Sequence, residues 1–167
     1  MPFYDRLLPE SPLVSLDEYR ATGGGAGLET LDRIGPGAAL DVLRASGMRG
    51  RGGAGFPTAI KWTGLAAEKG RKFVVANVSE GEPGTFKDRW MIRNNPYQLL
   101  EGLTVACRMV GAEQGFIGIK YKHLQAIERI EQAAVEMVDA GMIGEPPITI
   151  VRGPTPTCSA KRRRCWR

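Results

Sequence analysis

The sequence is poor in the residues that form disulfides and bind metals. Its 167 residues include three cysteines and one histidine. Cys107, Cys158 and Cys165 form no C-x-x-C pair, and one histidine cannot complete a zinc site with them. An odd cysteine number without framework spacing also argues against a disulfide-stapled secreted domain. No run approaches the roughly 18 apolar residues of a membrane span, and the start MPFYDRLLPESPLVSL lacks an apolar signal-peptide core. We therefore expect a cytoplasmic protein without membrane insertion.

Acidic side chains are missing from the C-terminal end of the chain. Residues 154–167, here called the tail, contain five cations and no Asp or Glu, which accounts for the formal net charge of +5. These cations are Lys161, Arg162, Arg163, Arg164 and Arg167. Residues 1–153 are therefore close to neutral, and the basic charge describes the tail alone. A Lys/Arg run with a tryptophan can bind nucleic acid, so a nucleic-acid-binding protein is one interpretation, although the neutral body adds no basic stripe.

Helical and strand patterns alternate along the rest of the chain. Apolar spacing and capping signals predict helices at residues 16–22, 27–34, 37–46, 58–68, 94–110 and 123–140. Strands are expected at 72–77, 115–120 and 147–151, the first of them buried, and 78–89 is expected to be a polar loop. This order predicts an α/β fold, with a helical N-terminal region followed by a partial, mostly parallel Rossmann-like sheet with flanking helices.

A glycine-rich loop, GRGGAGF at residues 50–56, carries the pattern G-x-G-x-x-G at Gly50, Gly52 and Gly55. The dinucleotide-binding fingerprint needs a strand before this pattern, and the segment before it is predicted to be helical. The ordinary Rossmann interpretation therefore fails its context test. A tight loop that only packs two helices together remains an alternative.

The chemistry of this loop still suits a nucleotide. Residues without side chains let backbone N–H groups approach an anion or a flat ring. Arg51 and Lys61 add cations, a helix beginning at Thr58 adds a partial positive charge, and Phe56 can stack on a base.

An acidic loop, NVSEGEPGTFKDR, follows the first predicted strand. Asn77, Glu80 and Glu82 lie where the carboxyl end of a parallel strand presents groups to ligands. Their side chains can hydrogen-bond a heterocycle or a ribose. The alternative is a solvated surface turn.

Together the two loops resemble a known family. SGMRGRGGAGFPTAIKW, followed by N-x-x-E-x-E-P-G-T-F-K-D-R, is similar to the NADH-binding flavoprotein subunit of respiratory complex I. The same module occurs in NAD-reducing hydrogenases and NAD-dependent formate dehydrogenases. SLDEYRATGG and NPYQLLEGLTVA also resemble that family, so the resemblance covers roughly residues 12–153.

The resemblance implies FMN and NADH as cofactors and assigns roles to individual residues. Gly50, Arg51, Gly52, Gly53, Ala54 and Gly55 would lie against FMN and NADH, with Lys61 reaching the cofactors. Phe56 would stack on the NADH adenine, Asn77 and Glu80 would hydrogen-bond FMN, and Glu82 would lie near the nicotinamide. Other subunits of a multi-subunit oxidoreductase, including a thioredoxin-like [2Fe–2S] subunit, would be partners, and the location would be cytoplasmic, peripheral to the inner membrane within a complex.

Three positions depart from the family. Ser79, also an expected cofactor-binding residue, stands where the family often has Asp, which weakens one flavin contact. Gly64 stands where some members carry a second adenine-stacking aromatic, and Ala59 replaces a frequent Gly.

The tail departs from the family altogether. After the strand matching ITIVRGP, members continue with a sequence like DTYLFGEE and later carry a cysteine-ligated [4Fe–4S] domain, and this chain shows neither. One coding of residues 154–167, with a single G inserted after the first codon, translates as PDTYLFGEEKALLE. We therefore interpret residues 155–167 as a frameshift product. The expected organisation is an N-terminal arm and helices over 1–47, a partial FMN/NADH-binding domain over 48–153, and an aberrant basic tail over 154–167.

The function expected from the resemblance is that of an N-terminal fragment of an NADH-oxidising flavoprotein. The parent protein would pass a hydride from NADH to FMN and electrons on to an iron–sulfur cluster, without a catalytic acid or base of its own. The fragment itself is expected to be inactive. A binding-only nucleotide module without electron transfer is a further alternative.

Overall fold

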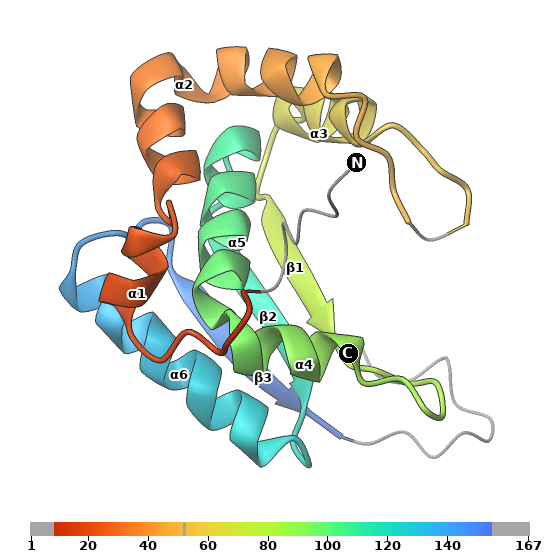
Figure 1. Cartoon of the computed structure of the whole chain (residues 1–167). Coiled ribbons are helices and arrows are strands. Elements are labelled where there is room, and N and C mark those ends of the chain that lie inside the picture. The colour runs from red at the N-terminus through yellow and green to blue at the C-terminus, as the bar shows by residue number, and fades with distance from the viewer. Residues whose placement is uncertain (1–8, 52, 155–167) are drawn as a thin grey trace, which may run out of the picture.

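The computed structural model describes residues 9–51 and 53–154 (Figure 1). Its helices are α1 (Leu16–Ala21), α2 (Ala26–Ala45), α3 (Thr58–Ala67), α4 (Lys87–Asn94), α5 (Pro96–Val110) and α6 (Leu124–Asp139). Its strands are β1 (Phe73–Val78), β2 (Gln114–Lys120) and β3 (Ile148–Gly153). Among these residues, no helix is both long enough and apolar enough to cross a membrane.

The three strands form one parallel sheet in the order β1-β2-β3, as predicted. The register pairs Val75 with Phe116 and Phe116 with Thr149. Helices α4, α5 and α6 cover one face of the sheet, and α2 and α3 lie at the end where β1 begins (Figure 1). The mixed, mostly parallel α/β fold with a helical N-terminal region is therefore confirmed.

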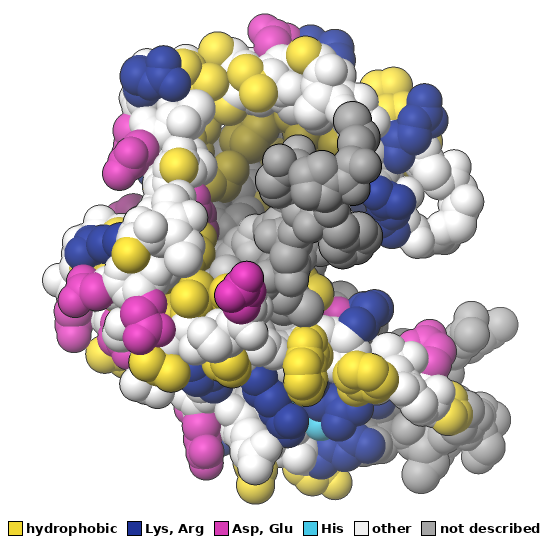
Figure 2. Space-filling view, viewed as in Figure 1, with side chains coloured by type: hydrophobic (Ala, Val, Ile, Leu, Met, Phe, Trp, Pro, Cys, Tyr) yellow, Lys and Arg dark blue, Asp and Glu magenta, His cyan; other side chains and the backbone are white. Residues whose placement is uncertain are grey.

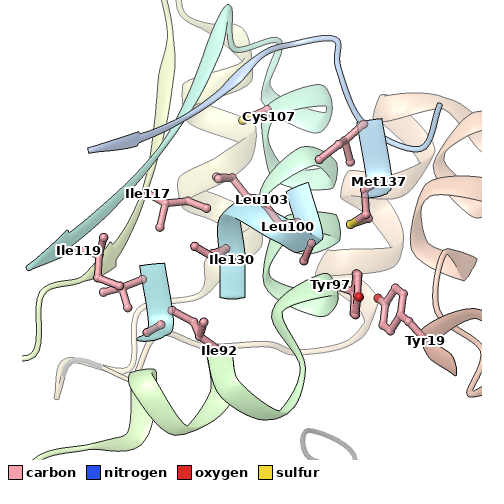
Figure 3. Close-up of a cluster of buried hydrophobic side chains, with 14 of the residues drawn as sticks. Tyr19, Ile92, Tyr97, Leu100, Leu103, Cys107, Ile117, Ile119, Ile130 and Met137 are labelled. Carbon is pink, nitrogen blue, oxygen red and sulfur yellow. The ribbon is translucent and has the colours of Figure 1, made fainter. Parts of the chain in front are cut away.

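The core lies between the covered face of the sheet and α5 and α6 (Figure 3). Ile117 and Ile119 of β2 point from the sheet toward Leu103 and Ile130, and all four side chains are buried. Cys107 is buried here too, and burial raises the pKa of its thiol to about 11, which keeps it protonated. Burial of this covered face stabilises the fold through the hydrophobic effect, and it fixes the position of the sheet against the helices.

The helical N-terminal region is anchored by one buried carboxylate. Glu101 of α5 accepts hydrogen bonds from the Tyr19 hydroxyl, from Gly25 N–H at 2.7 Å and from Gly27 N–H at 2.7 Å. The N-terminus of α2 is thereby satisfied by a side chain of another helix. Tyr19 also stacks on Tyr97 with ring centroids 5.3 Å apart, as Figure 3 shows.

Two expectations about local structure need correction, and a third is confirmed. The first strand is not buried, because Phe73, Val75 and Asn77 of β1 are exposed on the uncovered sheet face. The expected polar loop ends early, because α4 begins at Lys87 inside it. The two helices expected at 27–34 and 37–46 are confirmed: both lie within α2 and are separated by a kink at Gly35, whose φ of 77° and ψ of 165° are not helical.

Candidate functional site

The uncovered face of the sheet, here called the open face, forms an apolar hollow. Alternation along the strands brings Phe73, Val75, Phe116, Gly118 and Val151 to this face, where they line a cavity of about 390 Å³. Phe73 and Phe116 pack at a tilt with centroids 6.0 Å apart. Ordinary surfaces rarely present so many apolar side chains together, and such a face indicates a binding surface.

A groove beside α3 continues this hollow. Its volume is about 690 Å³, and it shares Phe73 and Val75 with the open face. Phe56 and Lys61, both expected cofactor residues, line it, and Phe56 is 54% exposed. Figure 2 shows the surface hollowed between α3, at the top of the view, and α4, at its base. We call the combined feature the groove.

The glycine-rich loop projects from the end of the groove and is closed at its base. Gly50 N–H donates to the Phe56 carbonyl at 2.9 Å, and Thr58 N–H donates to the Met48 carbonyl at 3.0 Å. Gly53 has φ of 96° and Gly55 has φ of 58°, values that favour glycine. The loop follows helix α2, as expected, so it is not a strand–loop–helix dinucleotide motif. Arg51 and Ala54 are exposed, and Gly52 lies outside the described residues.

Asn77 and Ser79 stand at the carboxyl end of the open face. Ser79 N–H donates to Asn77 Oδ1 at 3.0 Å, and the Ser79 hydroxyl donates to the Gly118 carbonyl at 3.2 Å. Gly118 itself lines the open face. Ser79 therefore ties the start of the acidic loop to the neighbouring strand.

Glu80 is buried within the loop, unlike its exposed neighbours. Its Oε1 accepts from Asp88 N–H at 2.7 Å, and its Oε2 pairs with Arg89 Nε at 2.7 Å. Buried Lys120, at the end of β2, donates from Nζ to the Glu80 carbonyl. Glu82, in contrast, is exposed. The two expected cofactor carboxylates therefore have different surroundings.

Charges around Glu80 set the ionisation of this end of the sheet. Burial acts to raise the Glu80 pKa, but Arg89, the Asp88 N–H group and Lys87 together outweigh it and lower that pKa. His123 is buried nearby, and burial together with the charges of Arg89, Lys122 and Lys120 lowers its pKa, so the imidazole is neutral. Its Nε2 has no hydrogen-bond partner among the residues that the structure describes. Figure 2 shows Lys and Arg side chains gathered around this histidine.

The fold brings some expected residues together and keeps others apart. Phe56 and Lys61 line the groove together with residues of β1. Asn77 and Ser79 lie at the carboxyl end of the same sheet face. Glu80 does not line the groove, because its side chain is buried in its own loop against Arg89. Arg89, Lys120 and the apolar lining residues Phe73 and Val75 were not predicted from the sequence. FVVANV is apolar except for Asn77, so it gave no signal for which side chains are exposed, and the KDR at the end of the acidic loop was the available signal for Arg89.

The composition of the groove fits a flat ligand with an anionic group. Aromatic and aliphatic side chains form its walls, and Lys61 adds a cation. Gly64 leaves open space, since a Cβ built there meets nothing within 4 Å. Within residues 9–51 and 53–154, no three His, Cys, Asp or Glu side chains group to hold a metal ion. These features fit a flavin or a nicotinamide nucleotide.

Comparison with known proteins agrees with this composition. Residues 43–161 match the family described as the Nuo51 FMN-binding domain. An F subunit of the NADH-quinone oxidoreductase of Rhizobium meliloti is 40% identical over 139 residues, which cover 82% of this chain and 32% of that protein. The HndC subunit of the NADP-reducing hydrogenase of Solidesulfovibrio fructosivorans is 36% identical over 132 residues, which cover 78% of this chain and 27% of that protein. The chain thus spans about a third of the length of the curated relatives it matches.

A solved structure shows the same fold. The NAD⁺-reducing [NiFe]-hydrogenase in its H₂-reduced state superimposes with a TM-score of 0.70 at 31% identity, covering 87% of this chain and 26% of that one. The F subunit of the Escherichia coli NADH-quinone oxidoreductase is 31% identical over 147 residues, which cover 86% of this chain and 33% of that protein. By sequence and by fold, this chain belongs to the Nuo51 FMN-binding domain family.

Proposed function

We propose that this chain is the cofactor-binding segment of an NADH-oxidising flavoprotein subunit, with FMN and NADH as its ligands. One observation carries the proposal: the groove unites Phe56 and Lys61 beside α3 with the open face of the sheet. The family match, to an FMN-binding domain, supports the same conclusion.

The residues of the groove bind and orient the ligands. Lys61 offers a cation to a phosphate, Phe56 offers a ring to the adenine, and the glycine-rich loop lets backbone N–H groups approach. Asn77 and Glu82 lie toward the carboxyl end of β1, where polar groups meet the flavin and the nicotinamide. FMN, when bound, supplies the ring that accepts a hydride and passes electrons to an iron–sulfur cluster. The protein contributes proximity and orientation.

The parent assembly is proposed to be a multi-subunit oxidoreductase. Relatives named as subunits of an NADH-quinone oxidoreductase and of a hydrogenase support such partners, including a thioredoxin-like [2Fe–2S] subunit. A cytoplasmic location, peripheral to the inner membrane within a complex, follows from the same proposal. No finding favours the nucleic-acid interpretation, and its basic residues 155–167 lie outside the described part of the chain.

This chain is proposed to be inactive in electron transfer and to bind FMN weakly or not at all. The open face provides one wall of a cofactor site, and Phe73 and Val75 on it stay exposed. A ligand held against a single wall keeps much of its surface in water, which limits affinity.

NMR titration of the ¹⁵N-labelled chain tests the proposal. Millimolar NADH should shift the amide signals of Phe56, Lys61, Val75 and Asn77, and leave those of α6 unchanged. Absence of any shift with NADH or FMN would refute the cofactor site. Tight stoichiometric FMN, seen as a yellow protein that releases flavin on denaturation, would instead refute the weak binding.

The division of the chain is also proposed: helices over 1–47, the cofactor domain over 48–153, and an aberrant tail over 154–167. Sequencing the locus tests the frameshift. We expect an alternative frame encoding YLFGEE at residues 157–162, and its absence would refute the frameshift.

A further inference from the structure

Arg89 joins the two ends of the acidic loop. Its Nε donates to Glu80 Oε2 at 2.7 Å, and its Nη2 donates to the Thr85 carbonyl at 2.8 Å. One planar guanidinium therefore contacts residues five positions apart. Between them, Thr85 N–H donates to the Glu82 carbonyl at 3.3 Å, and Gly84 has φ of 80°, so residues 82–85 form a turn with Pro83 at its second position. The loop is thus folded back on itself.

Two further contacts fix Glu80. Its side chain is 2% exposed, and Asp88 N–H, near the start of α4, donates to its second carboxylate oxygen. Phe86, which precedes α4, gives that helix no side-chain cap, so Glu80 satisfies the helix terminus instead. Lys120 holds the Glu80 carbonyl from the end of β2. The Glu80 carboxylate is fully engaged by the protein, while Glu82 stays exposed at the tip of the loop.

We propose that Arg89 is a positioning residue for NADH binding, because it presets the acidic loop at the carboxyl end of the open face through its bonds to Glu80 and Thr85. The inference rests on the proposed function. A preset loop offers Glu82 and the backbone of the turn to a ligand without the entropic cost of ordering them on binding. Arg89 is 33% exposed at its side chain and acts on the loop, and it touches no groove-lining residue in the contacts above.

The experiment compares Arg89→Gln, Arg89→Lys and the control Arg93→Gln in the full 167-residue chain. Arg93 lies one turn further along α4, is exposed, and bonds only Gln125 among the described residues, so its loss removes the same charge. The probes are NADH and AMP, with dissociation constants from NMR titration. AMP serves as the reference ligand because it carries the adenine and phosphate proposed to bind Phe56 and Lys61, and lacks the nicotinamide proposed to lie near Glu82.

Arg89→Gln is expected to raise the NADH dissociation constant about tenfold and to change that for AMP less than twofold. Arg89→Lys should give an intermediate loss, because a single ammonium cannot donate to both Glu80 and Thr85 in the same geometry. Arg93→Gln should bind both ligands as the parent chain does. Should Arg89→Gln fail to fold, as judged by circular dichroism, Arg89→Lys carries the comparison.

Three results would overturn the inference. Equal weakening of NADH and AMP would show general structural damage. Unchanged NADH binding in both Arg89 variants would show that the loop needs no presetting. A parent chain that binds neither ligand would refute the proposed function and the inference with it, whereas the first two results leave the proposed function standing.

Discussion

Glu80 and Glu82 are two residues apart, and the fold gives them opposite surroundings. Glu80 is buried against Arg89, and Glu82 is exposed at the loop tip. Both were predicted to contact the cofactors, because they follow a predicted strand and because of the family resemblance. Side-chain type alone cannot separate a structural carboxylate from a ligand-binding one, because the difference lies in which partners the fold brings near.

Lys61 is the residue whose loss should affect cofactor binding most directly. It is exposed and lines the groove beside Phe56. Lys61→Ala is expected to weaken NADH binding about tenfold, since a charge-assisted hydrogen bond to phosphate is lost. Lys69→Ala removes the same charge from an exposed position after α3, and Glu128→Ala alters the surface of α6, so both should bind NADH normally. Isothermal titration or NMR distinguishes them, and equal effects would contradict the role of Lys61.

Acid should destabilise the chain through His123. The folded pKa of this buried imidazole lies below its ordinary value of 6.5, so the unfolded chain takes up the proton first. The free energy of unfolding is therefore expected to fall as the pH drops below 6.5. The lowered pKa of Glu80 adds a second loss below its ordinary value of 4.5, as the pH falls through the folded pKa.

Urea unfolding at about pH 7.5 and about pH 5.5, on either side of the ordinary histidine pKa, measures the His123 effect. The chain has one histidine, so His123→Gln should flatten the pH dependence in this interval. An unchanged slope in His123→Gln would show that another group controls it.

At the scale of elements, Glu101 holds α1 and α2 onto α5. Its carboxylate satisfies Tyr19, Gly25 and Gly27 at once. Glu101→Ala would leave three donors unsatisfied, and we expect a loss of about 3 kcal/mol in the free energy of unfolding. Glu101→Gln keeps one acceptor oxygen and should lose less. Urea denaturation checks both, with Glu128→Ala on α6 as the control, and a loss no larger than the control's would contradict the anchoring role.

Local signals predicted most elements because their caps are local. Ser15 accepts from Glu18 N–H at 3.3 Å, and Asn95 accepts from Gln98 N–H at 3.2 Å with Pro96 next in the helix. Helix α4 was not predicted because the N–H of Asp88, at its N-terminal end, is satisfied by Glu80, which lies outside the helix. A cap supplied across a loop leaves no signature at the helix start itself.

At the scale of the whole molecule, the sheet has one covered face and one open face. The open face should bind the dye ANS in the native state, because it exposes Phe73, Val75 and Val151 together. Val75→Thr, at a position 51% exposed, should lower that fluorescence while keeping a β-branched residue in the strand. Val138→Thr changes a valine 52% exposed on α6 and should leave it unchanged. Equal effects would place the dye elsewhere.

The edges of the sheet matter at the same scale. Within the described residues, β1 and β3 each pair with β2 alone, so both are edge strands. Open sheet edges and an exposed apolar face favour association with other protein chains. We therefore expect this chain to fold poorly when it is expressed alone.

The sequence by itself determined the helices with local caps, the parallel α/β order and the family, because these depend on neighbouring residues and on long motifs. The tertiary structure alone decided that one face of β1 is exposed, that Glu80 is buried in its own loop and that Arg89 and Lys120 contact it. These outcomes depend on contacts between residues distant in the chain, such as Lys120 with Glu80, and on which face of the sheet the helices cover. Alternation in a strand predicts two faces, and only packing selects which one is buried.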